Sequence, residues 1–153
     1  MKNLWPLSRE LFSEILADRI TDKFVCKLIW ERLDYQPIAN HAVTLSAGAS
    51  TPDYWSRKFP QAPEVISQRS ASVHLTRSIP KEYKQSLKNY LNFEGYRIDE
   101  LFPRRTRRAT VVNWLVAWTL IRGEDVPPDG PLPPLSEIPV NPLEGHPGDP
   151  RIE

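Results

Sequence analysis

Arg104-Arg-Thr-Arg-Arg-Ala-Thr-Val-Val-Asn-Trp-Leu-Val-Ala-Trp-Thr-Leu-Ile-Arg122 is the stretch of sequence that decides the fold. Four arginines open it, a dense apolar run fills it, and Gly123 closes it. As a helix it would be hydrophobic on nearly every side, which is typical of the central helix of a small domain. We therefore expect the rest of the chain to pack around a helix near residues 104–122.

Three further helices are predicted because apolar residues recur at helical spacing. They lie near residues 8–20, 22–33 and 80–92, with Ser8, Thr21 and Ser78 as their capping residues. A small antiparallel sheet is predicted from segments near 42–46 and 72–77, where apolar and polar side chains alternate. The fold class is therefore α+β and mostly helical. A winged-helix-like module is the alternative, although no amphipathic recognition helix with base-reading side chains supports it.

The composition changes abruptly after Gly123. We expect residues 5–123 to form a single globular domain and residues 124–153 to form a disordered, proline-rich acidic tail. The tail holds nine of the 16 prolines and seven of the 19 acidic residues, whereas 19 of the 20 Lys and Arg precede it. A basic domain favours an acidic partner, and the chain's own tail is one candidate for an intramolecular contact.

The arginines that open the central stretch are the strongest candidate for a binding site. The N-terminus of a helix is its positive end, so each exposed cation there costs about 0.3–1 kcal/mol. An anion held by guanidinium groups and free backbone N–H groups would relieve this repulsion. The predicted anion- or partner-binding residues are Arg104, Arg105, Arg107 and Arg108, extended by Arg97, Arg77 and Lys81.

A second interpretation of these arginines stays open. They could pair with nearby acids such as Asp99 and Glu100, or lay their aliphatic stems over the core. Tyr96 and His74 would offer stacking faces for single-stranded nucleic acid if the predicted site residues converge, and would otherwise pack in the core.

No catalytic motif is present in the sequence. Its six glycines form no phosphate loop or dinucleotide fingerprint, and no serine lies in a Gly-x-Ser-x-Gly context. The single cysteine, Cys26, excludes an internal disulfide and a cysteine-based metal cluster. The three histidines have no ligand-like spacing, so we expect neither a metal nor a cofactor. The longest apolar window, 109–121, is too short to span a bilayer, which predicts a soluble protein.

Two side-chain types within the central stretch also raise alternatives. Trp114 and Trp118 lie four residues apart and share a helix face, where they form either core contacts or an aromatic ridge for a partner. Asn113 needs a hydrogen-bond partner if it is buried, and would then tether a neighbouring loop.

Several segments together resemble a known family. They are Ile20–Tyr35, Leu75-Thr-Arg-Ser-Ile-Pro80, Gly95-Tyr-Arg-Ile98 and Pro103-Arg-Arg-Thr-Arg-Arg-Ala109. The family is similar across most of residues 7–122; it occurs in cyanobacteria with plastid relatives and is catalogued as domain of unknown function number 1823. The resemblance implies a location in cyanobacterial cytoplasm or plastid stroma. It carries no assigned activity, so no functional residue transfers from it.

Three functions are compatible with these features. The first is a non-enzymatic adaptor or assembly protein of a phototroph, whose arginine-rich helix start engages an acidic protein partner. The second is an RNA- or DNA-binding protein that uses the same basic face for phosphates. The third, which the sequence supports least, is an enzyme with an anionic substrate.

Overall fold

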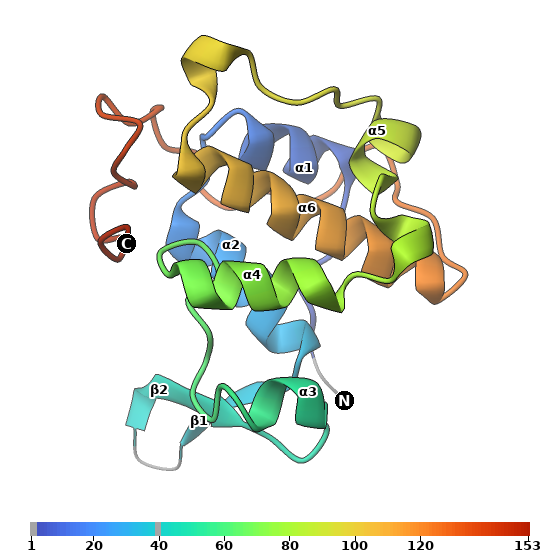
Figure 1. The fold of residues 1–153 in the computed structure, drawn as a ribbon, viewed down its shortest axis with the longest axis vertical. Coiled ribbons are helices and arrows are strands. Elements are labelled where there is room, and N and C mark those ends of the chain that lie inside the picture. The colour runs from blue at the N-terminus through green and yellow to red at the C-terminus, as the bar shows by residue number, and fades with distance from the viewer. Residues whose placement is uncertain (1–2, 39–40) are drawn as a thin grey trace.

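A computed structural model describes residues 3–38 and 41–153 of the chain, without the side chains of residues 41–43. Within this part the chain forms six α-helices, two short 3-10 helices and one two-stranded sheet (Figure 1). In chain order these are α1 (Arg9–Leu16), α2 (Asp22–Arg32), β1 (Tyr35–Ile38), β2 (His41–Ala47), α3 (Asp53–Ser56), α4 (Arg69–Ser78), η1 (Lys81–Tyr83), α5 (Ser86–Leu91), η2 (Ile98–Glu100) and α6 (Pro103–Ile121).

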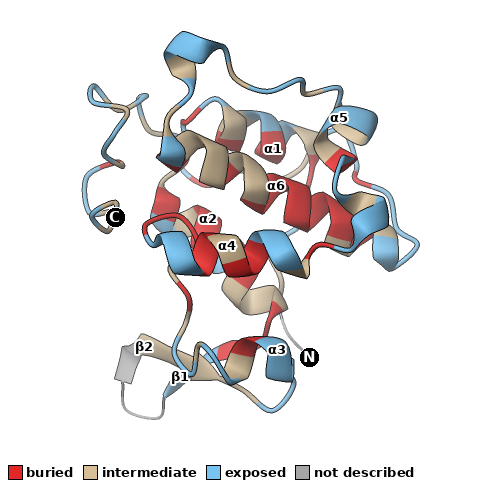
Figure 2. Cartoon of the chain, viewed as in Figure 1, coloured by how far each residue is buried: buried red, intermediate tan, exposed pale blue. Residues whose placement is uncertain are grey.

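The predicted central helix is α6, and its position is confirmed. It contacts α1, α2, α4 and α5, and these helices surround it in Figure 1. The run Val111–Ala117 is buried, so the core of the protein follows the middle of this helix (Figure 2). Gly123 ends it in the left-handed conformation, at φ 73°, which glycine adopts without steric cost.

The first two helices begin at the predicted caps. The Ser8 hydroxyl accepts a hydrogen bond from the Leu11 amide at 3.0 Å, and the Thr21 hydroxyl accepts one from the Phe24 amide at 3.2 Å. The first helix is shorter than predicted because Asp18 adopts φ 65° and turns the chain. The helix predicted near 80–92 is divided into η1 and α5.

The sheet is antiparallel, as predicted, but only one of its strands was identified correctly. β2 covers the predicted segment 42–46, and it pairs with β1, so that Tyr35 lies opposite Ala47 and Pro37 opposite Leu45. Pro37 lies within β1. Proline is tolerated there because each strand of a two-stranded sheet is an edge strand.

The strand predicted at 72–77 is wrong, because these residues lie within helix α4. The alternation of Val73 and Leu75 spans too few residues to distinguish a strand from a helix. The buried side of α4 consists of Ala71, Ser72, His74 and Leu75, and three of these four lack the large apolar side chains that reveal a helical stripe.

Residues 124–153, hereafter the C-terminal segment, contain neither helix nor strand but lie against the domain. The Arg9 amide donates to the Pro127 carbonyl at 2.9 Å, and the Ser136 amide donates to the Arg19 carbonyl at 2.8 Å. This packed chain differs from the expected disordered tail. Prolines restrict the unfolded chain, so an extended segment loses less entropy when the domain orders it.

Among the described residues, no helix combines the length and apolar composition that crossing a membrane requires.

Candidate binding site

Two of the predicted site arginines are buried in an internal ion-pair cluster. The Arg104 guanidinium holds both carboxylate oxygens of Asp18, at 2.7 and 2.6 Å, and its Nε donates to Asp22 at 2.9 Å. The Arg108 guanidinium donates to Asp22 at 2.6 Å and to the Ile15 carbonyl at 2.8 Å. Arg104 is 1% exposed and Arg108 is fully buried. Neither side chain is accessible to a partner in this conformation.

The chain itself supplies the anions that the start of α6 requires. The tight turn after α1 presents Asp18, and Asp22 is the first residue of α2. Asp18 and Asp22 are four residues apart in the sequence, and so are Arg104 and Arg108. Two carboxylates therefore face two guanidiniums. The internal acids thereby relieve the repulsion between these arginines and the helix N-terminus.

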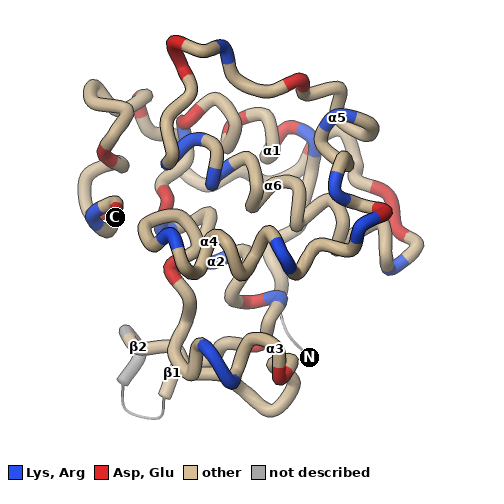
Figure 3. The backbone as a smooth tube through the Cα atoms, viewed as in Figure 1, with Lys and Arg blue, Asp and Glu red and all other residues tan. Residues whose placement is uncertain are grey.

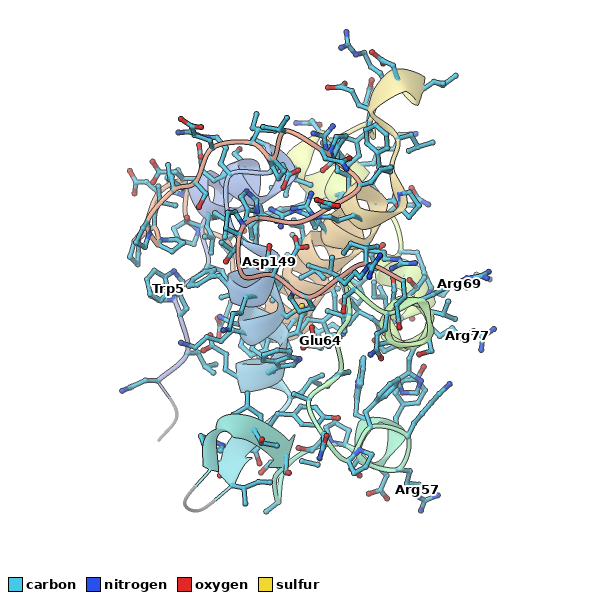
Figure 4. All side chains as sticks on the ribbon, turned by 90° about the vertical axis from the view of Figure 1, so that its left-hand side faces the viewer. Trp5, Arg57, Glu64, Arg69, Arg77 and Asp149 are labelled. Atoms are coloured by element: carbon cyan, nitrogen blue, oxygen red, sulfur yellow. The ribbon has the colours of Figure 1, made fainter. Side chains whose placement is uncertain are left out.

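This cluster changes the acidity of its members. Burial raises the pKa of Asp18, but the hydrogen bond from Arg104 and the charge of Arg108 outweigh it, so the pKa lies below its usual value. The neighbouring Glu64 has no such donor. Burial raises its pKa, and the charge of Asp149 raises it further. Figure 4 shows Glu64 and Asp149 on the side of the molecule that the C-terminal segment crosses.

The C-terminal segment closes the cluster. His146 is 3% exposed, and its Nε2 lies 2.9 Å from the Asp18 carbonyl, which can only accept, so Nε2 carries the hydrogen. The Asp149 carboxylate accepts hydrogen bonds from the amides of Asp22 at 2.9 Å and Lys23 at 3.1 Å. An acid from the segment therefore caps α2.

Asp22, His146 and Asp149 each offer a ligand atom within 4.8 Å of the others, a spacing that a metal ion could use. The Asp22 oxygens, however, already accept from Arg104 and Arg108. Two guanidiniums beside the same carboxylate would repel a cation. The arrangement suits an internal charge cluster better than a cation site.

The other predicted site residues are dispersed. Arg105 reaches Asp18 at 3.4 Å and is 14% exposed, and Arg107 donates to the Ile66 carbonyl at 2.8 Å. Arg97 is exposed beside η2 and pairs with Glu100 at 3.0 Å, which fits the local-pairing interpretation for this residue. Lys81 is exposed on η1.

Arg77 lies toward the other end of the molecule. It lines the same hollow as Trp118, which is 14 residues after Arg104 on α6 and therefore about 21 Å along the helix axis. The structure does not bring the seven predicted residues into one patch.

One group of exposed basic residues lies on α4 and just after α3, and a second, of lysines, runs along η1 and α5. We define the basic face as Arg57, Lys58, Arg69 and Arg77, all of which are exposed. Figure 4 shows the three arginines pointing outward on the same side, and Figure 3 places basic residues at both ends of α4. Arg69 and Arg77 form no ion pair with any described residue.

Arg107 adjoins this face. Burial lowers the pKa of the Arg107 guanidinium, and the charge of Arg69 lowers it further, which shows that the two groups lie close enough to repel.

Beside Arg77 the surface is hollowed into an open groove of about 460 Å³, which we call the Arg–Trp groove. Arg32, Arg77 and Arg122 line it together with four aromatic rings, and its described lining includes no acidic residue. The rings are Tyr54, Trp55, Trp114 and Trp118. Of the two tryptophans of α6, Trp114 is 8% exposed and packs in the core, one of the two predicted alternatives, whereas Trp118 is half-buried at the groove.

His74 and Tyr96, the two predicted stacking residues, do not present free ring faces beside the arginine cluster. His74 is buried, and its ring stacks on Tyr54 with 3.9 Å between centroids. The Tyr96 hydroxyl donates to the Leu16 carbonyl at 2.9 Å. Asn113 behaves as predicted: its side chain accepts from the Leu87 amide at 2.8 Å and donates to the Lys84 carbonyl at 3.2 Å, which ties α5 to α6.

The comparisons with known proteins agree with this architecture. Residues 6–120 match a family model described as Domain of unknown function (DUF1823). The chain belongs to the DUF1823 family. A structure solved by solution NMR is 37% identical to it, with a TM-score of 0.64, over 78% of this chain and 98% of that one. No protein of curated function shows significant similarity.

The DUF1823 match ends before the C-terminal segment, so His146 and Asp149 lie outside the family region. The match includes the buried ion-pair cluster and α4. These comparisons assign no activity to any residue, and the site must be inferred from its geometry.

Sequence reasoning missed Arg32, Arg69 and Arg122 as surface candidates. Arg69 was overlooked because it precedes a segment interpreted as a strand. Arg32 and Arg122 lie at the C-terminal ends of α2 and α6. Only the packing of these two helices places both guanidiniums over the Trp118 ring. A usable signal was present for Arg108, which lies four and seven residues before Val112 and Leu115 and so shares their buried face.

Proposed function

We propose that this DUF1823 protein is a non-enzymatic binding or adaptor protein that engages an acidic protein partner through its basic face. The observation that carries the proposal is the pair of exposed arginines on α4. Arg69 and Arg77 stand at opposite ends of one helix, are exposed, and have no described carboxylate to neutralise them. Unpaired cations of this kind attract and orient an acidic surface.

The start of α4 adds to this charge. Arg69 is its first residue, the first turn holds no acid, and the Gln68 side chain does not cap it. The repulsion that the sequence predicted at the start of α6 is thus present at α4, where the arginine faces solvent. A carboxylate from a partner would relieve it.

The experiment is a titration of the protein with a fluorescent peptide rich in Glu and Asp. Replacing Arg69 and Arg77 by alanine should weaken binding about tenfold or more, since each charge contact contributes roughly 1 kcal/mol. The matched control replaces Arg19 and Lys27, two exposed cations on the α1–α2 side, and should change affinity less than twofold. Equal losses in the two double variants would reject the basic face as the site.

The same titration tests the location predicted from the sequence. Arg97 and Arg105 are two members of the predicted set near the start of α6 that retain some exposure. If their replacement by alanine weakens binding more than the α4 variant does, the partner contacts the start of α6.

Nucleic-acid binding is the alternative, and the exposed ring of Tyr54 favours it because bases stack on such rings beside arginines. A single-stranded RNA in place of the peptide distinguishes the two. Nucleic acid binding should fall steeply with salt in a log-linear manner. Preference for RNA over the acidic peptide would replace the proposal with this alternative.

A location in the cytoplasm of a phototroph, or in plastid stroma, belongs to the same proposal. It follows from the resemblance to the DUF1823 family rather than from any contact described above.

A further inference from the structure

The Arg–Trp groove contains an unusual concentration of positive charge around one aromatic ring. The guanidinium carbon of Arg122 lies 3.7 Å from the centroid of Trp118, and that of Arg32 lies 4.9 Å from it. The indole ring attracts both cations, but they also repel each other. Burial lowers the pKa of the Arg32 guanidinium, and the charge of Arg122 lowers it further, whereas Glu31 raises it.

Arg32 is incompletely satisfied within the protein. Its side chain is 2% exposed and lines the groove. Its terminal nitrogens donate to the carbonyls of Leu28 and Trp5 and to Glu31, but its buried Nε has no hydrogen-bond partner among the described residues. A buried donor without an acceptor destabilises a protein. The buried Arg32 guanidinium keeps an incompletely satisfied positive charge in the lining of the groove.

The wall of the groove is rigid before any ligand arrives. The Tyr54 hydroxyl donates to the His74 carbonyl at 3.0 Å, and His74 Nε2 donates to the Tyr54 carbonyl at 2.7 Å. On the other side, Trp114 Nε1 donates to the Ser78 hydroxyl at 3.0 Å. Side chains held in this way lose little entropy on binding.

The volume and lining of the groove limit what it can hold. About 460 Å³ is within the range of pockets for small ligands or a few peptide residues. Its rings favour a flat apolar group, and Arg77 and Arg122 at its edge favour negative charge beside that group. A uniformly charged segment would leave the rings without a complementary surface.

We propose that the Arg–Trp groove binds an aromatic side chain of the acidic partner, with carboxylates on either side of that ring contacting Arg77 and Arg122. This inference rests on the proposed function and specifies the recognised chemistry: an aromatic residue within an acidic segment. The ring packs against Trp118 and Tyr54.

The test uses the full chain and two peptides of equal negative charge, one with a central phenylalanine and one with alanine in its place. The wild-type protein should bind the phenylalanine peptide about tenfold more tightly, because ring burial and cation–π contact together contribute on the order of a factor of ten. Arg122→Gln should reduce this preference to about twofold or less. Arg69→Gln, which lies outside the groove, should weaken the binding of both peptides equally and so keep the preference for the phenylalanine peptide.

Trp118→Leu provides a second groove variant, with its fold checked by thermal denaturation. Equal affinity of the wild-type protein for both peptides would overturn the groove proposal while leaving the basic face intact. Failure of both peptides to bind would overturn the proposed function, and this inference with it. If Arg122→Gln folds but retains the full preference, the ring binds elsewhere and the groove proposal is wrong.

Discussion

At the scale of single residues, the function of an arginine depends on whether its charge is neutralised inside the fold. Arg104 and Arg108 are buried against Asp18 and Asp22, whereas Arg69 and Arg77 face solvent without an ion pair to any described residue. All four look alike in a composition count. Burial and pairing therefore separate structural arginines from candidates for partner binding.

Replacing Arg104 by alanine should destabilise the protein by about 3–5 kcal/mol, because it removes the two short hydrogen bonds to buried Asp18. The longer contacts of Arg105 and Arg108 with Asp18 compensate its charge only in part. Chemical denaturation followed by circular dichroism measures this. Arg105→Ala is the matched control, since its contact with Asp18 is 3.4 Å long and its side chain is partly exposed; its cost should be about 1 kcal/mol or less. Similar stability of the two variants would show that the cluster contributes little.

The lowered pKa of Asp18 predicts how the free energy of unfolding depends on pH. Its pKa is lowered in the folded protein, so its contribution is fully present above its unfolded pKa of about 3.9 and is lost as pH falls below that value. Denaturation curves between pH 3 and 7, compared with Asp18→Asn, measure this. The variant should be less stable near neutral pH and lose less stability on acidification. Parallel curves would contradict the pairing.

At the scale of elements, the sequence predicted those helices whose buried side is rich in large apolar residues or whose start is capped by a hydroxyl. α1, α2 and α6 meet these conditions, and α4 does not. Its buried side includes Ser72 and His74, so large apolar residues do not recur at helical spacing in this segment. The sequence therefore does not indicate that Arg69 and Arg77 lie at the two ends of one helix. The pairing of Arg104 with Asp18 spans 86 residues, and only the tertiary fold brings these side chains together.

The C-terminal segment yields a prediction at this scale. Asp149→Ala should destabilise the protein by about 0.5–2 kcal/mol, because the amides of Asp22 and Lys23 at the start of α2 lose their acceptor. Thermal denaturation measures the change, and Glu144→Ala, an exposed acid on the same segment, is the control. An unchanged melting temperature for Asp149→Ala would mean that the segment does not hold α2 in solution.

At the scale of the whole molecule, the charges divide into two regions along α6. Near its start, Arg104 and Arg108 pair with Asp18 and Asp22 beside the C-terminal segment. Toward its end, the Arg–Trp groove presents arginines and aromatic rings to solvent, and the basic face lies beside it along α4 and after α3. This division makes the second region the better candidate for binding, although the sequence drew attention to the first.

The most direct test of this account is an NMR titration of the isotopically labelled protein with an acidic peptide. The account predicts that backbone and indole shifts concentrate on Arg69–Ser78, Tyr54, Trp118 and Arg122, while the amides of residues 104–108 and of Asp18 change little. Shifts concentrated at the start of α6, or no shifts at millimolar peptide, would contradict it.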